Sequence, residues 1–309
     1  MKTAFVFSGQ GAQYVGMGKE LFQQEKIVQD TFTEASDVVG YDMAKLCFTE
    51  NEQLNETAYT QPAILTVSVA FYRLLEEKGY HPDVVAGLSL GEYSALVASG
   101  AILFPQAVEL VAKRGKYMTE AAPTGTGKMV AVMNTDRTLI ETICKEASSF
   151  GIVSPANYNT PQQIVIGGEV LAVDKAVELL TDAGVKRMIP LNVSGPFHTA
   201  LLKPASEKLA AELTTIAFSE MKIPVISNTT AEVMKQVEIK QLLEKQVMSA
   251  VRFAESIETM KEMGVDTIIE VGPGKTLTGF VKKIDKSLQI ARVEDEKTLH
   301  EAFTLLDGR

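Results

Sequence analysis

The chain has 309 residues, of which 46% are hydrophobic and 22% are charged. This is the balance of an ordinary globular protein of about one or two domains, and it excludes disorder, collagen-like repeats and a coiled coil as the main architecture. The 30 Lys and Arg against 39 Asp and Glu leave a net charge of −9, which argues against a nucleic-acid partner, because duplex binders carry a basic footprint.

Short apolar segments alternate with longer amphipathic segments along the chain. This alternation predicts an α/β protein with a largely parallel sheet. The expected strands are 3–7, 83–88, 129–133, 163–166, 187–192, 223–227, 267–271 and 288–292. The expected helices include 61–78, 90–99, 105–120, 137–148, 170–183, 204–213, 239–249, 253–262 and 275–283.

A turn-forming stretch rich in Pro and Gly, residues 122–127, interrupts this alternation. A strand, a helix, a turn at 157–161, a strand, a helix and a last strand near residue 192 follow it. This order predicts a ferredoxin-like α+β insert over 125–195, with a large domain formed by 1–124 and 196–309. Clefts between domains are common ligand sites, so we expect a site near the hinge at 194–196.

The two cysteines, Cys47 and Cys144, lie far apart and lack a metal-ligand spacing, so we expect neither a disulfide framework nor a metal site. The apolar run at residues 4–7 is shorter than the ~7–15 residues of a signal-peptide core. No stretch approaches the ~18 apolar residues of a membrane span. We therefore expect a soluble, cytoplasmic protein that does not bind a membrane.

Gly87-Leu88-Ser89-Leu90-Gly91 is the strongest local motif. It follows an apolar strand and opens a helix, which is the context that a G-x-S-x-G nucleophile elbow requires. The tight turn exposes the serine, and the helix N-terminus directs amides at an oxyanion. The alternative is a chance match in which Ser89 only caps the helix; the strand–turn–helix context favours the nucleophile.

A nucleophilic serine needs a base, and the chain has only three histidines. His81 lies before the start of the elbow strand, eight positions from Ser89, which places it roughly 20–25 Å away at ~3.3 Å per residue. His300 lies in an apparent surface helix. His198 lies at the predicted hinge and is therefore the favoured partner of Ser89. The group that orients its second nitrogen is not evident from the sequence; a backbone carbonyl or an Asn is compatible with the pattern.

Two further residues are candidates for a pocket. Arg114 shares a helix face with Leu110 and Met118, where a guanidinium needs an anion or several acceptors; a structural salt bridge is the alternative. Gln10 follows the first strand between two glycines and either supplies a donor to a pocket or belongs to an ordinary turn.

Taken together, these residues resemble the malonyl-CoA:acyl-carrier-protein transacylase family of type II fatty acid synthesis. The resemblance spans essentially the whole chain. The motifs that carry it, in order, are residues 5–11, 87–96, Arg114-Gly115, Asn157-Tyr158-Asn159, Pro196-Phe197-His198 and 270–275.

The resemblance implies an α/β-hydrolase-like large domain with the ferredoxin-like insert. It implies Ser89 as nucleophile, His198 as base, and Arg114 as the partner of the malonyl carboxylate. The amides of Gln10 and Leu90 would form the oxyanion hole. Substrate-site roles are also implied for Gln246, whose carbonyl would hold the His198 ring, and for Asn157.

It further implies malonyl transfer from malonyl-CoA to acyl carrier protein in a ping-pong reaction without a metal or other cofactor. We expect a monomer. Acidic carrier proteins would dock on a basic patch, for which Lys282, Lys283 and Lys286 or Lys113 and Lys116 are candidates. A thioesterase with the same Ser and His and a non-catalytic acyl-binding protein are the competing hypotheses.

The chain departs from many family members at Leu88, where they carry His. This position is not the family's base, so only the polarity of the pocket beside Ser89 is affected. Phe197, directly before His198, resembles the malonyl-selective form of related polyketide acyltransferases.

Overall fold

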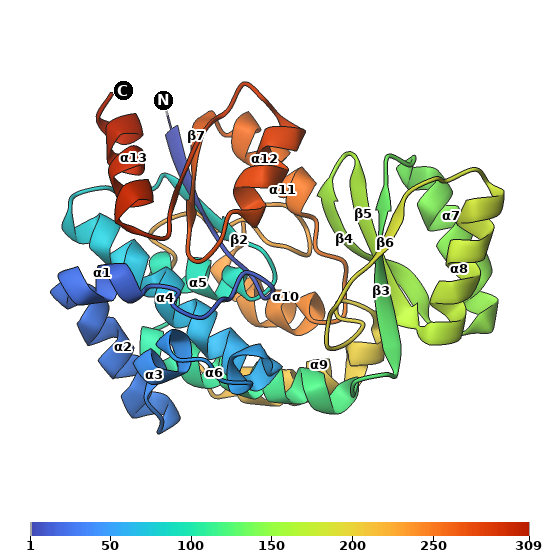
Figure 1. Cartoon of the computed structure of the whole chain (residues 1–309), viewed down its shortest axis with the longest axis horizontal. Helices are drawn as coiled ribbons and strands as arrows, with labels where there is room; N and C mark the ends of the chain where they lie inside the picture. The colour runs from blue at the N-terminus through green and yellow to red at the C-terminus, as the bar shows by residue number, and fades with distance from the viewer. Residues whose placement is uncertain (1, 309) are drawn as a thin grey trace.

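The computed structural model describes residues 2–308. It contains a parallel sheet surrounded by helices and a separate antiparallel sheet with two helices on its outer face (Figure 1). The predicted α/β class, with a parallel sheet and a smaller α+β unit, is confirmed.

Four parallel strands in the order β2-β1-β7-β8 form the centre of the large domain. Alternate side chains of β1 enter two different cores: Phe5 and Phe7 join the larger one, whereas Ala4 and Val6 join a second. Both faces are buried, as parallel strands require. The strands are β1 (Lys2–Phe7), β2 (Val84–Gly87), β7 (Val265–Val271) and β8 (Gln289–Val293).

Helices cover both faces of this sheet (Figure 1). The second core lies under α11 (Phe253–Glu262) and α12 (Thr276–Ile284), and the larger core lies under the other helices. These other helices are α1 (Lys19–Gln24), α2 (Lys26–Val39), α3 (Met43–Phe48), α4 (Thr57–Glu77), α5 (Gly91–Ala98), α6 (Phe104–Ala121), α9 (Lys203–Thr214), α10 (Ile239–Gln246) and α13 (Glu296–Asp307). The sequence pattern did not predict α1, α2 or α3.

The small domain has the element order β-α-β-β-α-β and the sheet order β4-β5-β3-β6, which is the ferredoxin-like arrangement. All three pairings are antiparallel. Its elements are β3 (Gly127–Met133), α7 (Arg137–Ala147), β4 (Val153–Thr160), β5 (Gln163–Glu169), α8 (Val170–Asp182) and β6 (Met188–Pro190). They lie inside the predicted insert; its boundaries at 125 and 195 stay a prediction.

The expected turn at 157–161 is wrong, because residues up to Thr160 belong to β4. Asn157 and Tyr158 pair with β5 on one side, and Tyr158 N donates to Val251 O (2.8 Å) on the other. Pairing on both edges overrides the turn preference of the two asparagines. The link to β5 is therefore only Pro161 and Gln162.

The expected strand at 223–227 is also wrong. Val225 forms a single parallel bridge with Val85, and Ile226 then bridges Val233. The chain reverses directly afterwards, since Ala231 N donates to Ser227 O (2.8 Å). This reversal places Asn228 beside the end of β2, where it contacts the elbow.

Two strand-to-helix turns meet backbone to backbone at the carboxyl edge of the parallel sheet. A Cβ atom on Gly91 would lie 2.1 Å from Phe7 O, and one on Gly9 would lie 2.3 Å from Leu88 O. Only glycine permits this approach. The turn after β1 and the turn after β2 are thereby held in contact.

Within residues 2–308, no helix combines the length and the apolar character needed to cross a bilayer.

Gly91→Ala should lower the free energy of unfolding by about 1–3 kcal/mol, the usual cost of overpacking, because the added methyl group overlaps Phe7 O. Gly279→Ala in α12 is the matched control: its Cβ meets nothing within 4 Å, so alanine should stabilise the helix by about 0.5–1 kcal/mol. Urea denaturation measures both. Equal effects at the two positions would show that the turns separate easily.

Candidate active site

Ser89 lies in the left-handed region, with φ of 54°, between β2 and α5. This conformation costs about 1–3 kcal/mol for a non-glycine residue and is typical of functional turns. The side chain of Asn228 holds the turn: its Oδ1 accepts from Ser89 N (2.7 Å), and its Nδ2 donates to Gly87 O (2.6 Å). The predicted elbow is therefore present and braced from a distant segment.

His198 lies beside Ser89, with 2.7 Å between Nε2 and Ser89 Oγ. Its Nδ1 lies 2.8 Å from Gln246 O. Because a carbonyl oxygen only accepts, Nδ1 carries the proton and Nε2 is free to accept from the hydroxyl. The orienting group that the sequence left open is thus a backbone carbonyl.

The imidazole is 4% exposed. Burial, and then the positive charge of Arg114, lower the pKa of His198 to about 4. The ring is therefore neutral at physiological pH, which is the form that takes a proton from Ser89.

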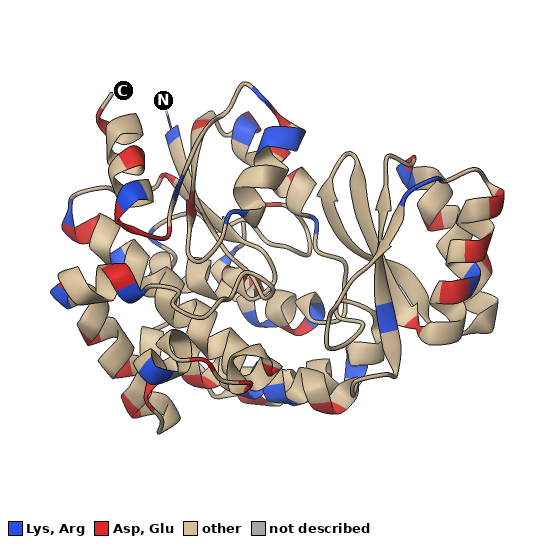
Figure 2. Ribbon diagram, in the orientation of Figure 1, with Lys and Arg blue, Asp and Glu red and all other residues tan. Residues whose placement is uncertain are grey.

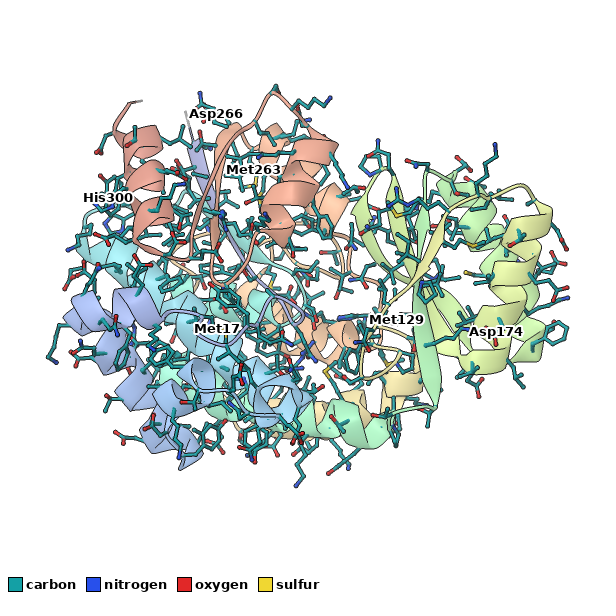
Figure 3. The ribbon with its side chains drawn as sticks, in the orientation of Figure 1. Met17, Met129, Asp174, Met263, Asp266 and His300 are labelled. Carbon is teal, nitrogen blue, oxygen red and sulfur yellow. The ribbon has the colours of Figure 1, made fainter. Side chains whose placement is uncertain are left out.

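The other two histidines lie away from this pair. The half-exposed ring of His81 is 4.0 Å from Glu76. His300 lies on the surface of α13 (Figure 3), where its Nδ1 donates to Glu296 O (2.8 Å).

Arg114 extends from α6 to the nucleophile and is 1% exposed. Its Nη1 donates to Gln61 Oε1 (2.9 Å), and its Nη2 donates to Gln246 Oε1 (2.9 Å) and to Ser89 Oγ (3.3 Å). No carboxylate of residues 2–308 forms an ion pair with it, and no acceptor there bonds its Nε. Burial lowers the pKa of Arg114, but a guanidinium stays charged.

This arrangement decides against the salt bridge that the sequence left open as an alternative. A buried cation with only neutral contacts, beside a nucleophile, has capacity for an incoming carboxylate.

The amides expected to form an oxyanion hole lie at the two touching turns. Among residues 2–308, neither Gln10 N nor Leu90 N donates to a protein acceptor. The side chain of Gln10 is engaged elsewhere, since its Nε2 donates to Thr57 Oγ1 (3.1 Å) and its Oε1 accepts from Gln61 Nε2 (3.3 Å). Both amides therefore keep their donors for a ligand oxygen.

A cavity of about 640 Å³ opens above Ser89 between the two domains. Asn157 and Asn159 line it from β4, and Met129, labelled in Figure 3, lines it from β3. Asn159 is buried, and its Oδ1 accepts no hydrogen bond from residues 2–308. Leu88 also lines the cavity and adds an apolar side chain beside Ser89.

Three contributors were not found from the sequence: Gln61, Glu92 and Asn228. Glu92 is fully buried in α5, three residues after Ser89. Burial raises its pKa to about 7, whereas the hydrogen bonds from Asn228 and Gln246 and the charge of Arg114 favour its ionised form. A carboxylate in an otherwise apolar helix was a signal that could have been used. Gln61 and Asn228 gave no such signal, because only the fold brings them near Ser89.

Among residues 2–308, no group of three His, Cys, Asp or Glu side chains could hold a metal ion.

Residues 4–299 match the model of the acyl transferase domain family. A serine in an elbow turn beside the unpaired Arg114 guanidinium suits this class of enzyme. The malonyl CoA-acyl carrier protein transacylase of Bacillus subtilis is 45% identical over 308 residues, covering 99% of this chain and 97% of its own length.

Two solved structures are also similar. MCAT from Streptococcus pneumoniae has 61% identity and a TM-score of 0.97, with 98% of this chain and 99% of that chain covered. A malonyl-transacylase in complex with its type II PKS acyl-carrier protein has 45% identity and a TM-score of 0.95, with the same coverage. The chain belongs to the malonyl CoA-acyl carrier protein transacylase family.

Acylation of Ser89 by p-nitrophenyl acetate, which has no carboxylate for Arg114, should be independent of pH between about 5 and 8. The rate should fall only as the pH drops through about 4, where His198 gains a proton and loses its acceptor. Stopped-flow measurement of nitrophenol release reports the rate, and circular dichroism at each pH excludes unfolding. A midpoint near the ordinary His value of 6.5 would show that burial does not control this ring.

Proposed function

We propose that this chain transfers the malonyl group from malonyl-CoA to the phosphopantetheine thiol of acyl carrier protein through a malonyl ester of Ser89. The observation that carries this function is the buried Arg114 guanidinium, which contacts Ser89 Oγ and only neutral acceptors. A malonyl group has both features that the site would bind: a thioester for Ser89 and a carboxylate for Arg114.

In the first half-reaction, His198 Nε2 takes the Ser89 proton while Oγ attacks the thioester carbonyl. The amides of Gln10 and Leu90 stabilise the oxyanion. The carbon–sulfur bond breaks, and the coenzyme A thiolate leaves with the proton from His198. In the second half-reaction, His198 deprotonates the carrier's thiol, which attacks the ester carbonyl. The bond from this carbon to Ser89 Oγ breaks, and Oγ leaves with the proton from His198.

Both acyl carriers are substrates, so this proposal includes no metal and no resident cofactor. We expect the protein to act as a monomer in the cytoplasm, as the sequence predicts. Asn157 and Asn159 would border the bound thioester from the small domain.

Figure 2 shows basic residues in blue on α12, the helix that contains Lys282 and Lys283. The lysines proposed for carrier docking differ in their surroundings. Lys113 pairs with Glu109 and Glu212, and Lys116 lies 4.0 Å from Glu120. Within residues 2–308, Lys282 and Lys283 of α12 have no acidic partner. This difference supports docking of an acidic carrier at α12, because free charges steer association better than neutralised ones.

Incubation with malonyl-CoA, read by intact mass, tests the proposed function. The wild type should gain one malonyl group, and Ser89→Ala should gain none, because the ester has no oxygen to form on. Rapid release of malonate without an adduct would indicate a thioesterase, and an unchanged mass would indicate a binding protein.

The same assay tests the base. His198→Ala should form the adduct about 10²–10⁴-fold more slowly, the usual contribution of a positioned base. His300→Ala is the control and should match the wild type.

Arg114→Ala should lower malonyl transfer by ~10–100-fold and leave acetyl transfer nearly unchanged or faster. Each hydrogen bond to a charged group contributes roughly 1.5–3 kcal/mol, and about 1.4 kcal/mol equals a factor of ten. The measurement is the ratio of the two transfer rates. Arg73→Ala is the control, since Arg73 pairs with Glu34 away from the site. If both rates fell together, Arg114 would have a structural role only.

A further inference from the structure

A second buried charge lies one hydrogen-bonded link away from Arg114. Glu92 is 0% exposed, and both of its carboxylate oxygens accept: Oε1 from Asn228 N (2.8 Å) and Oε2 from Gln246 Nε2 (2.7 Å). Buried charges without such partners are costly, so this carboxylate is built into the network around the nucleophile.

Gln246 connects the two charges. Its Nε2 donates to Glu92 Oε2 and to Ser89 O (2.9 Å), and its Oε1 accepts from Arg114 Nη2 (2.9 Å). A side-chain amide has one donating end and one accepting end. Both Glu92 oxygens face N–H donors, so the ionised side chain holds the donating end of the Gln246 amide, and the amide oxygen faces Arg114.

We propose that Glu92 is a positioning residue for substrate selection: through the Gln246 amide, it orients Arg114 and balances its charge without touching it. This inference rests on the proposed function. A carboxylate in direct contact with Arg114 would compete with the substrate carboxylate for the same N–H donors. The amide between them keeps the opposite charges close enough to attract each other in the low-dielectric interior and leaves the guanidinium available.

Glu92→Gln removes the charge with almost no change in volume. The new side chain keeps the Asn228 N bond through its oxygen and therefore presents an NH₂ group to Gln246 Nε2. Two donors then face each other, and rotation of the Gln246 amide would instead turn its NH₂ toward Arg114. In either case Arg114 loses its fixed position.

The ratio of malonyl to acetyl transfer should fall about tenfold or more in Glu92→Gln, the loss expected for one charge-assisted contact. Glu270→Gln is the matched control. Glu270 is also 0% exposed, but it accepts from Leu277 N, Thr278 N and the Thr278 hydroxyl at the start of α12. Its substitution should lower the unfolding temperature and leave the ratio unchanged.

The double variant Glu92→Gln/Gln246→Glu keeps the total volume and one carboxylate, which guards against a folding failure of the single variant. It puts the carboxylate in direct contact with Arg114, so the ratio of malonyl to acetyl transfer should fall at least as far as in Glu92→Gln. A wild-type ratio in either variant would overturn the inference. A wild type that forms no malonyl adduct would instead contradict the proposed function, so the two failures are distinguishable.

Discussion

The contact between two backbone turns is the constraint on which the whole site depends. The turns after β1 and β2 touch because Gly9 and Gly91 leave no side chain between them. This contact brings the turns that carry Gln10 and Leu90 together beside Ser89, and Gln10 and Ser89 line the cavity. The proposed transfer reaction needs amides that are already in place before charge develops, and the contact between the two turns fixes the backbone that carries these two.

The buried charge of Arg114, beside the Ser89 turn, has no anion in direct contact with it among residues 2–308. Its hydrogen-bond partners are neutral, His198 is uncharged, and the nearest carboxylate reaches it only through an amide. Such a site favours ligands that bring their own negative charge. In the proposed function, the free carboxylate of the malonyl thioester supplies the anion that Arg114 lacks.

Local features could be predicted from the sequence. The elbow was predicted because a strand, five residues and a helix define it without help from the rest of the chain. Arg114 was found from helical spacing, and His198 was favoured by elimination among three histidines. The structure brings all three together, while their catalytic roles stay predictions.

Contacts that depend on distant segments could not be predicted in the same way. Asn228 reaches Ser89 across 139 positions of the chain, and the segment directly before it, residues 223–227, was mistaken for a strand. The strand β4 was mistaken in part for a turn because Asn157 and Tyr158 are stabilised by pairing with β5 and Val251, which no local propensity reveals.

The carbonyl that holds His198 has a consequence for the direction of the chemistry. A catalytic imidazole is often paired with a carboxylate, which stabilises the imidazolium; Gln246 O carries no full charge, and the pKa of His198 is about 4. The protonated ring is therefore a stronger acid than an ordinary imidazolium, which favours return of its proton to the departing thiolate. Over the two half-reactions together, one thioester is exchanged for another of similar energy, so the ratio of each thioester to its free thiol sets which way malonyl groups flow.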